Sequence, residues 1–161
     1  PAPERGTDPE SELAPPAIDD ETATSEVARG HAGEAATHAQ EQARRIQLAL
    51  HGDKNQRAAI LRDKNPQLHG YVLKNPQLQL DEIVHMARMP TASADLLNQI
   101  AARREWAERP EVASALARNP KTPIPLAIRM LDHVTESELR NLAKQGVRDQ
   151  IQRAARKELL G

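Results

Sequence analysis

The amino-acid sequence predicts an all-α fold, a short right-handed α-solenoid of helical repeats that follows a disordered N-terminal arm. Three observations support this prediction. Good helix formers are abundant in the 161 residues and aromatic residues make up only 1%, whereas sheets draw on aromatic and β-branched side chains. Helical patterns recur at a period in the forties, which is typical of stacked helix repeats. The composition also changes near residue 34.

The composition excludes several kinds of site and of location. The chain contains no cysteine, so disulfides, thiolate metal sites and cysteine nucleophiles are excluded. No apolar run approaches the ~20 residues that a membrane-spanning helix needs. The first ten residues lack the basic start and the apolar core of a signal peptide. We therefore expect a cytoplasmic protein with no membrane span.

Residues 1–34 are predicted to form a disordered acidic arm. They are rich in Pro, Ser, Thr, Gly and acids, so too little apolar surface is available to offset the entropy of ordering. Residues 1–41 carry ten acids and two bases, a net charge of −8, whereas residues 42–161 carry 20 bases and 13 acids, a net charge of +7. The arm is either a solvating tail or a tether whose acids cover a basic surface until a partner displaces them.

Residues 35–161 are predicted to form the helical repeat domain. An Ala-rich segment ends at His51-Gly52, since glycine is a common helix terminator. A Lys-Asn pair then recurs three times at ten-residue intervals, beginning at Lys54, Lys64 and Lys74. Each Asn side chain can cap a helix that follows it, and the second and third pairs are followed by proline, which favours the first helical position.

A longer period of 44 residues organises the rest of the chain. Residues 66–88 align with residues 110–132 at this shift, and the aligned pairs include Asn75 with Asn119. After a predicted slip of one residue, Asp95, Leu96 and Asn98 align with Glu138, Leu139 and Asn141. We therefore predict units at about 66–108 and 109–147 and a partial unit at 148–160. A period in the forties built only of helical segments is typical of HEAT and armadillo arrays.

Each predicted unit contains three helices. The first helix covers about residues 66–73 in one copy and 109–118 in the next. The second carries apolar residues at i, i+3, i+4 and i+7, starting at Leu80 and at Ile124. The third begins, in its second copy, with a predicted capping box from Thr135 to Glu138. One unit alone leaves the apolar stripe of each helix uncovered, so the units are expected to stack.

Four runs of residues make the chain similar to a known family. They are Arg104-Glu-Trp-Ala, Pro110-Glu-Val, Ala115-Leu-Ala-Arg-Asn-Pro-Lys-Thr-Pro and Leu139-Arg-Asn-Leu-Ala-Lys. These runs resemble a family of uncharacterised bacterial helical-repeat proteins in the wider HEAT/armadillo-like class. The resemblance covers about residues 42–160 and leaves out the acidic arm. It implies the fold but no activity or ligand, because a fold alone does not define a function.

No catalytic site is predicted, and we expect a protein that is not an enzyme. The chain has no glycine-rich phosphate loop, nucleophile elbow or dinucleotide fingerprint. Asp81 and His85 lie one helical turn apart and could form half of a metal site or an acid–base couple. No further ligand lies at a spacing that completes the coordination, and such pairs are common on exposed helix faces. We therefore expect neither a metal nor a cofactor.

Asn98 and Asn141 are the candidate peptide-binding residues, predicted at equivalent positions of the third helices. In the armadillo proteins that this chain resembles, asparagines of the third helix hold the backbone of an extended peptide. An amide suits that task because it offers both a donor and an acceptor. The alternative is that both are solvent-facing fillers, and the chain lacks the tryptophan that armadillo grooves place beside each Asn. Trp106, the only indole, is either a core plug between units or, if exposed, a binding anchor.

A basic surface on the C-terminal helices is the second candidate site. Its members are Arg103, Arg104, Arg140, Lys144, Arg148, Arg153, Arg156 and Lys157. The spacing of Arg140, Lys144 and Arg148 predicts three cations on one helical face, where they could contact phosphates. Neighbouring acids and the lack of aromatic stacking platforms oppose this interpretation. The leading hypothesis is a non-catalytic protein- or peptide-binding scaffold, and nucleic-acid binding through the Lys/Arg row is the alternative.

Overall fold

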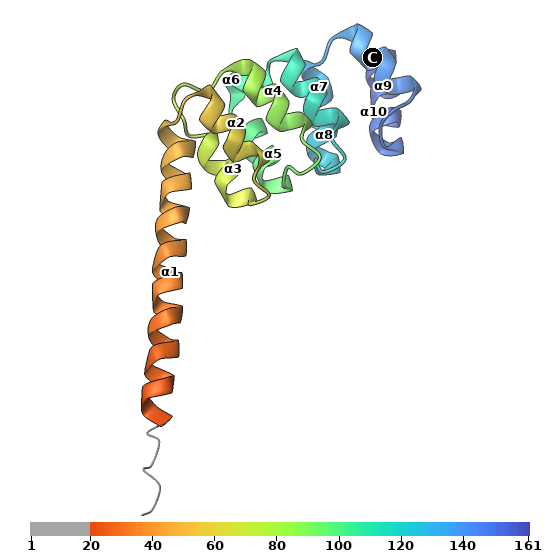
Figure 1. Cartoon of the computed structure of the whole chain (residues 1–161). Helices are drawn as coiled ribbons and strands as arrows, with labels where there is room; N and C mark the ends of the chain where they lie inside the picture. Colours follow the sequence, from red (N-terminus) through yellow and green to blue (C-terminus); the bar gives the residue numbers. More distant parts are fainter. Residues whose placement is uncertain (1–19) are drawn as a thin grey trace, which may run out of the picture. The chain divides into compact units, whose positions relative to one another are not determined.

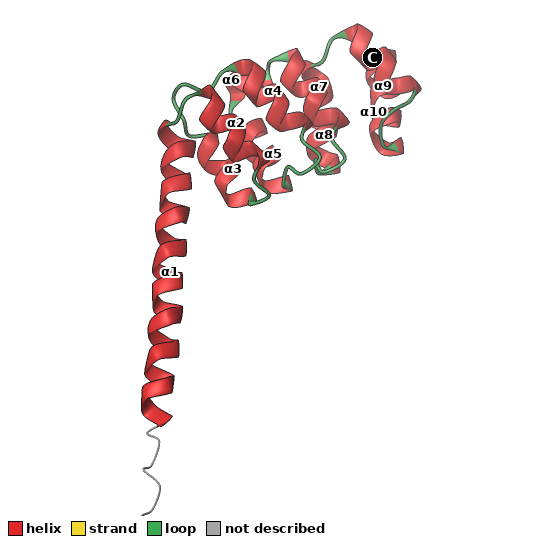
Figure 2. Ribbon diagram, in the orientation of Figure 1, coloured by secondary structure: helices red, strands yellow, loops and turns green. Residues whose placement is uncertain are grey.

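A computed structural model describes residues 20–161, with side chains described from residue 29 onward. The part of the predicted arm that comprises residues 1–19 lies outside the described residues. Residues 20–161 form ten α-helices and one short 3-10 helix, with no strand among them (Figure 2). The predicted all-α class is therefore confirmed. None of the helices in this described stretch is both long enough and apolar enough to cross a membrane.

The chain divides into two compact parts, Pro1–Ala39 and Gln40–Gly161. Helix α1 (Asp20–His51) runs across this boundary (Figure 1). Residues 20–34 are therefore helical, which differs from the disorder predicted for them. The physical reason is local, because alanine and glutamate recur along the segment and both favour helix. Packing does not hold the part from residue 29 to residue 41, since every side chain there is exposed.

The remaining helices are short. They are α2 (Lys54–Arg62), α3 (Pro66–Val72), α4 (Leu80–Arg88), α5 (Ala94–Ala102), α6 (Arg104–Ala107), α7 (Pro110–Arg118), α8 (Ile124–Met130), η1 (Leu131–His133), α9 (Glu136–Lys144) and α10 (Asp149–Leu160). The three helices predicted for the first copy of the 44-residue pattern are α3, α4 and α5. Those predicted for the second copy are α7, α8 and α9. Helix α6, a single turn that precedes α7, was not predicted.

The buried side chains of the Gln40–Gly161 part form two clusters. The first runs from Ala49 to Met130 and contains fully buried leucines such as Leu68 and Leu116. The second joins residues of α7, α8, η1, α9 and α10 and includes Leu142 and Ile151. Helix α4 packs on α7, α7 on α8, and α10 on both α8 and α9. Burial therefore links each helix to close neighbours in the chain, as expected for short helices that are marginal alone.

Helices α2, α5 and α9 begin with the same cap. The side-chain oxygens of Asp53, Ser93 and Thr135 accept hydrogen bonds from the backbone N–H three residues later, in Gln56, Leu96 and Glu138. A side-chain acceptor at this position satisfies one of the free donors of a helix N-terminus. Helix α2 therefore begins in the same way as α5 and α9, although it precedes residue 66.

Asn75 and Asn119, which are 44 residues apart, form the same buried clamp. The Nδ2 atom of Asn75 donates to the carbonyls of Ala49 (3.0 Å) and Gly52 (3.1 Å) at the end of α1. The Nδ2 atom of Asn119 donates to Ala87 (2.7 Å) and Met89 (3.1 Å) at the end of α4. Each clamp therefore gives a side-chain donor to two carbonyls at a helix end, of which Gly52 also accepts from Nη1 of Arg57 and Met89 also accepts from the N–H of Ala92.

The prediction that each Lys-Asn pair caps a helix is correct only once. Asn65 caps α3, because its side-chain oxygen accepts from the N–H of Gln67. Asn55 lies inside α2, which Asp53 caps, and Asn75 precedes a turn rather than a helix, since α4 begins at Leu80. A buried asparagine whose amide reaches a distant helix end has the same sequence signature as a capping asparagine, so the pattern did not distinguish them.

Candidate functional site

Helices α5 and α9, the predicted third helices, can be aligned in sequence by counting from their N-cap residues. Ser93 and Thr135 are 42 residues apart, and the same offset superposes the buried positions of the two helices. These are Leu97 with Leu139, Ile100 with Leu142, and Ala101 with Ala143. The predicted slip placed these helices at an offset of 43, which is wrong by one residue. As a result Asn98 corresponds to Arg140, and Gln99 is the counterpart of Asn141.

One shallow groove lies between α3 and α5. It has a volume of about 360 Å³ and is lined by Pro66, Gln67, Gly70, Tyr71, Lys74, Asp95 and Gln99. The Nζ atom of Lys74 lies 5.3 Å from the centroid of the Tyr71 ring, a cation–π contact. On the opposite wall, Nε2 of Gln99 donates to Oδ2 of Asp95 at 2.9 Å. The groove therefore presents an ammonium on one wall and an amide on the other.

A second groove lies between α7 and the end of α9. Its volume is about 390 Å³ and it is lined by Arg118, Asn141, Lys144, Gln145 and Gly146. The carboxylate of Glu138, beside it, accepts from Nε of Arg118 and from Oγ of Ser114, both at 2.6 Å. The hydrogen bond from Arg118 is the main cause that holds the pKa of Glu138 below its usual value. Glu138 therefore stays ionised and already holds two partners.

Two kinds of lining residue recur in the two grooves. Lys74, in the turn after α3, and Arg118, the last residue of α7, are 44 residues apart, whereas Gln99 of α5 and Asn141 of α9 are 42 residues apart. Each groove thus combines a cation with an amide. Sequence reasoning missed Gln99, although its amide offers the same donor and acceptor as asparagine. Counting from the caps at Ser93 and Thr135 would have found it.

Comparison with known proteins transfers no ligand or activity to these grooves. No family model, no curated protein and no solved structure matches the chain. The resemblance to a bacterial helical-repeat family therefore stays a hypothesis, and the function has to be argued from the geometry.

The predicted peptide-binding residues are not brought together. Asn141 lines the second groove, whereas Asn98 is exposed on α5 and lines neither groove. Trp106 is half-buried on α6, where it packs against the first core cluster. The guanidinium of Arg103 lies over its ring in a cation–π contact, with the central carbon 4.3 Å from the ring centroid. Trp106 is thus partly a core residue and lies outside both grooves.

Four members of the predicted basic surface are engaged within the protein. Arg104 pairs with Glu108 and Arg140 pairs with Glu136, each one turn away on the same helix. Nη2 of Arg148 donates to the carbonyl of Thr122 at 2.7 Å, and Nε of Arg156 donates to that of Ala143 at 2.9 Å. The other members, Arg103, Lys144, Arg153 and Lys157, are exposed.

The predicted helical face of Arg140, Lys144 and Arg148 is not formed. Helix α9 ends at Lys144, and Arg148 is the N-cap of α10. The chain turns between them at Gly146, whose φ of 89° lies in the left-handed region, which glycine adopts without steric cost. A continuous helix was assumed in the prediction, and this glycine interrupts it.

Asp81, predicted to pair with His85, forms an ion pair with Lys54. Oδ2 of Asp81 accepts from Nζ of Lys54 at 2.7 Å, and this hydrogen bond is the main cause that lowers the pKa of Asp81. Within the described residues, no group of three or more His, Asp or Glu side chains is placed to hold a metal ion.

Proposed function

We propose that the protein is a non-catalytic scaffold that binds an extended segment of another protein across the two grooves. In this proposal the Gln40–Gly161 part is a short HEAT/armadillo-like solenoid, and the cytoplasmic setting expected from the sequence is kept. The repeated caps at Asp53, Ser93 and Thr135 and the repeated clamps at Asn75 and Asn119 support the solenoid, since equivalent residues then join successive units.

The observation that carries the proposal is that an amide and a cation line each groove. Gln99 and Asn141, which take the same position in the proposed third helices, share their grooves with Lys74 and Arg118. An amide can donate to a peptide carbonyl and accept from a peptide N–H. Two such amides one unit apart suit a ligand whose backbone repeats donors and acceptors, which is an extended peptide.

Nucleic-acid binding through the Lys/Arg row has less support. Arg104, Arg140, Arg148 and Arg156 already hold partners within the protein. The ring of Trp106 beside this row is covered by Arg103, and the Tyr71 ring of the first groove is covered by Lys74. Single-stranded nucleic acids are held largely by stacking on aromatic side chains.

Selection from a phage-displayed library of random peptides of about twelve residues, followed by fluorescence anisotropy with an enriched peptide, tests the proposal. Such a peptide spans about 40 Å when extended, enough to reach beyond one groove. Gln99→Ala together with Asn141→Ala should weaken binding by about tenfold or more, because each lost hydrogen bond contributes about 0.5–1.5 kcal/mol.

The matched control is Asn98→Ala, which removes an exposed amide from the same helix outside the groove. It should leave the affinity unchanged, and all variants should keep the helical circular dichroism of the parent. Failure to enrich any peptide, or equal binding by the double variant and the control, would refute the proposed function.

A further inference from the structure

We propose that the segment bound across the grooves is acidic, and that its carboxylates pair with Lys74 in the first groove and Lys144 in the second. This inference rests on the proposed function and adds the chemistry of the partner. It starts from the charges that line the grooves, since exposed charges without a partner are the ones that a ligand can engage.

Lys74 provides the free cation of the first groove. It is exposed in the turn that follows α3, and it lines the groove together with Gln99. Among the residues whose side chains are described, no carboxylate lies within 4.0 Å of its ammonium group. Its contact with the ring of Tyr71 keeps the ammonium over the groove and leaves its N–H donors available.

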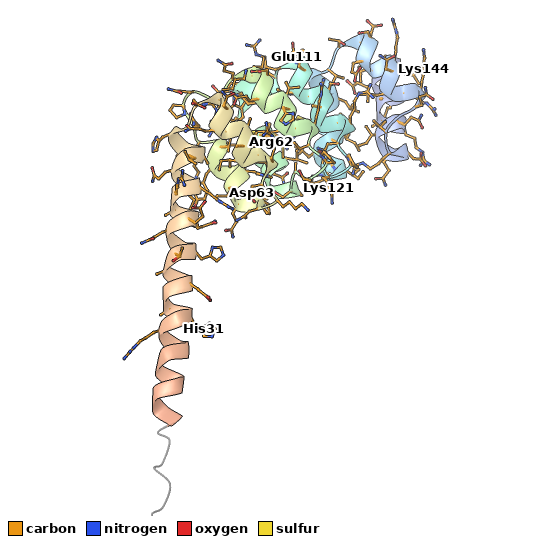
Figure 3. The ribbon with its side chains drawn as sticks, viewed as in Figure 1. His31, Arg62, Asp63, Glu111, Lys121 and Lys144 are labelled. Atoms are coloured by element: carbon orange, nitrogen blue, oxygen red, sulfur yellow. The ribbon has the colours of Figure 1, made fainter. Side chains whose placement is uncertain are left out.

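Lys144 provides the free cation of the second groove. It is the last residue of α9 (Figure 3), it is exposed, and it lines the groove together with Asn141. In the described part of the chain it too has no carboxylate within salt-bridge distance. Arg118, the other cation of this groove, is paired with Glu138 at 2.6 Å.

The carboxylates near the grooves are already engaged. Asp95 accepts from Gln99 and lies in the first turn of α5, where the helix dipole favours a negative charge. Glu138 accepts from both Arg118 and Ser114. Each groove thus holds one ammonium that no carboxylate approaches within 4.0 Å, although the negative charge of Asp95, which is bonded only to the neutral amide of Gln99, remains in the first groove.

The test uses the full 161-residue chain and the peptides enriched by the selection described above. The enriched sequences should contain at least two acidic residues, and the same peptide with Glu→Gln and Asp→Asn substitutions should bind about tenfold more weakly. On the protein, Lys74→Glu with Lys144→Glu should give a similar loss. That loss should shrink as salt is raised, since exposed charges are screened.

A matched control separates these sites from net charge. Lys64→Glu with Lys157→Glu makes the same change in charge at exposed lysines that line neither groove, and it should lower the affinity less than about threefold.

Two results overturn the inference while leaving the proposed function intact. One is an enriched peptide that depends on Gln99 and Asn141 but carries no acidic residue. The other is an equal loss of affinity in the groove pair and the control pair. If no peptide is enriched, both proposals fail. If a labelled oligothymidylate of about 20 nucleotides binds through Lys74 and Lys144 more tightly than any peptide, the partner is a nucleic acid and the inference is wrong.

Discussion

At the scale of single residues, the most unusual contact is the buried ion pair of Arg57 and Glu82. Nε and Nη2 of Arg57 each donate to a different oxygen of Glu82 at 2.8 Å, and both side chains are buried. Counted from the helix caps, the same positions in the next copy hold Leu97 and Leu126, which are buried in one core cluster. Counted from the caps, the ion pair therefore occupies positions that hold buried leucines in α5 and α8.

This substitution of charge for leucine leads to a stability prediction. Arg57→Leu alone leaves a buried carboxylate unpaired and should lower the free energy of unfolding by about 3–5 kcal/mol. Arg57→Leu combined with Glu82→Leu copies the second junction and should recover most of that loss. Urea unfolding followed by circular dichroism measures both variants. A double variant no more stable than the single one would contradict the equivalence of the two junctions.

Two glutamates make the stability depend on pH. Burial alone would raise the pKa of Glu82, but hydrogen bonds from Arg57 and from the N–H of Gln79 hold it below its usual value. The pKa of Glu138 is lowered chiefly by Arg118. A carboxyl group whose pKa is lower in the folded state stabilises the fold above its unfolded pKa, about 4.3 for Glu. That stability is lost as the pH falls through the folded value.

The free energy of unfolding should therefore decrease steadily as the pH falls below about 5. Glu138→Gln keeps a side-chain oxygen beside Arg118 and Ser114 but cannot titrate. Urea unfolding at a series of pH values should show a shallower acid loss for this variant than for the parent. Identical slopes would mean that Glu138 does not contribute to the acid sensitivity.

At the scale of helices, the buried asparagines connect elements that are distant in the chain. Asn119→Ala removes the side-chain donor of the Ala87 carbonyl and one of the two donors of the Met89 carbonyl, and it should cost about 2–3 kcal/mol, as expected when a buried acceptor is left unsatisfied. Asn65→Ala removes only the cap of α3 and should cost about 1 kcal/mol. Thermal and urea unfolding compare the two. Equal losses would show that the clamp is no more than a local cap.

The sequence was sufficient to predict the all-α class and to place α3, α4, α7 and α8, because apolar residues at helical spacing mark them directly. The offset between α5 and α9 was less accessible. It depends on where each cap falls after a turn of variable length, and the sequence pattern placed it at 43 rather than 42. Because of this one-residue error in the offset, the predicted amide was Asn98 rather than Gln99.

Contacts between residues that are distant in the chain could not be predicted from the sequence pattern. Arg57 and Glu82 are 25 residues apart, and neither position is marked as buried by its residue type. The same holds for Arg148 and Arg156, which looked like solvent-facing cations but donate to carbonyls of other segments. Polar residues whose partners are backbone groups leave no signature in composition or periodicity.

At the scale of the whole molecule, the two parts of the chain should differ in how they are stabilised. Residues 29–39 of α1 are exposed on every face, and an isolated helix of this kind is marginal in water. A variant that lacks residues 1–39 should keep the free energy of unfolding of the full chain within about 0.5 kcal/mol. A larger loss in urea unfolding would show that the first part stabilises the second.

The proposed solenoid makes a prediction about how a local defect spreads. In a linear array, each unit is stabilised by itself and its neighbours. Leu142, fully buried in the second cluster, supports α9 and α10. Leu142→Ala should cost about 2–5 kcal/mol and should lower hydrogen-exchange protection in α9 and α10 while sparing α3. Leu68→Ala, in the first cluster, should produce the opposite pattern. A uniform loss of protection in both variants would show a single cooperative core, and the description of this domain as a stack of repeats would then be wrong.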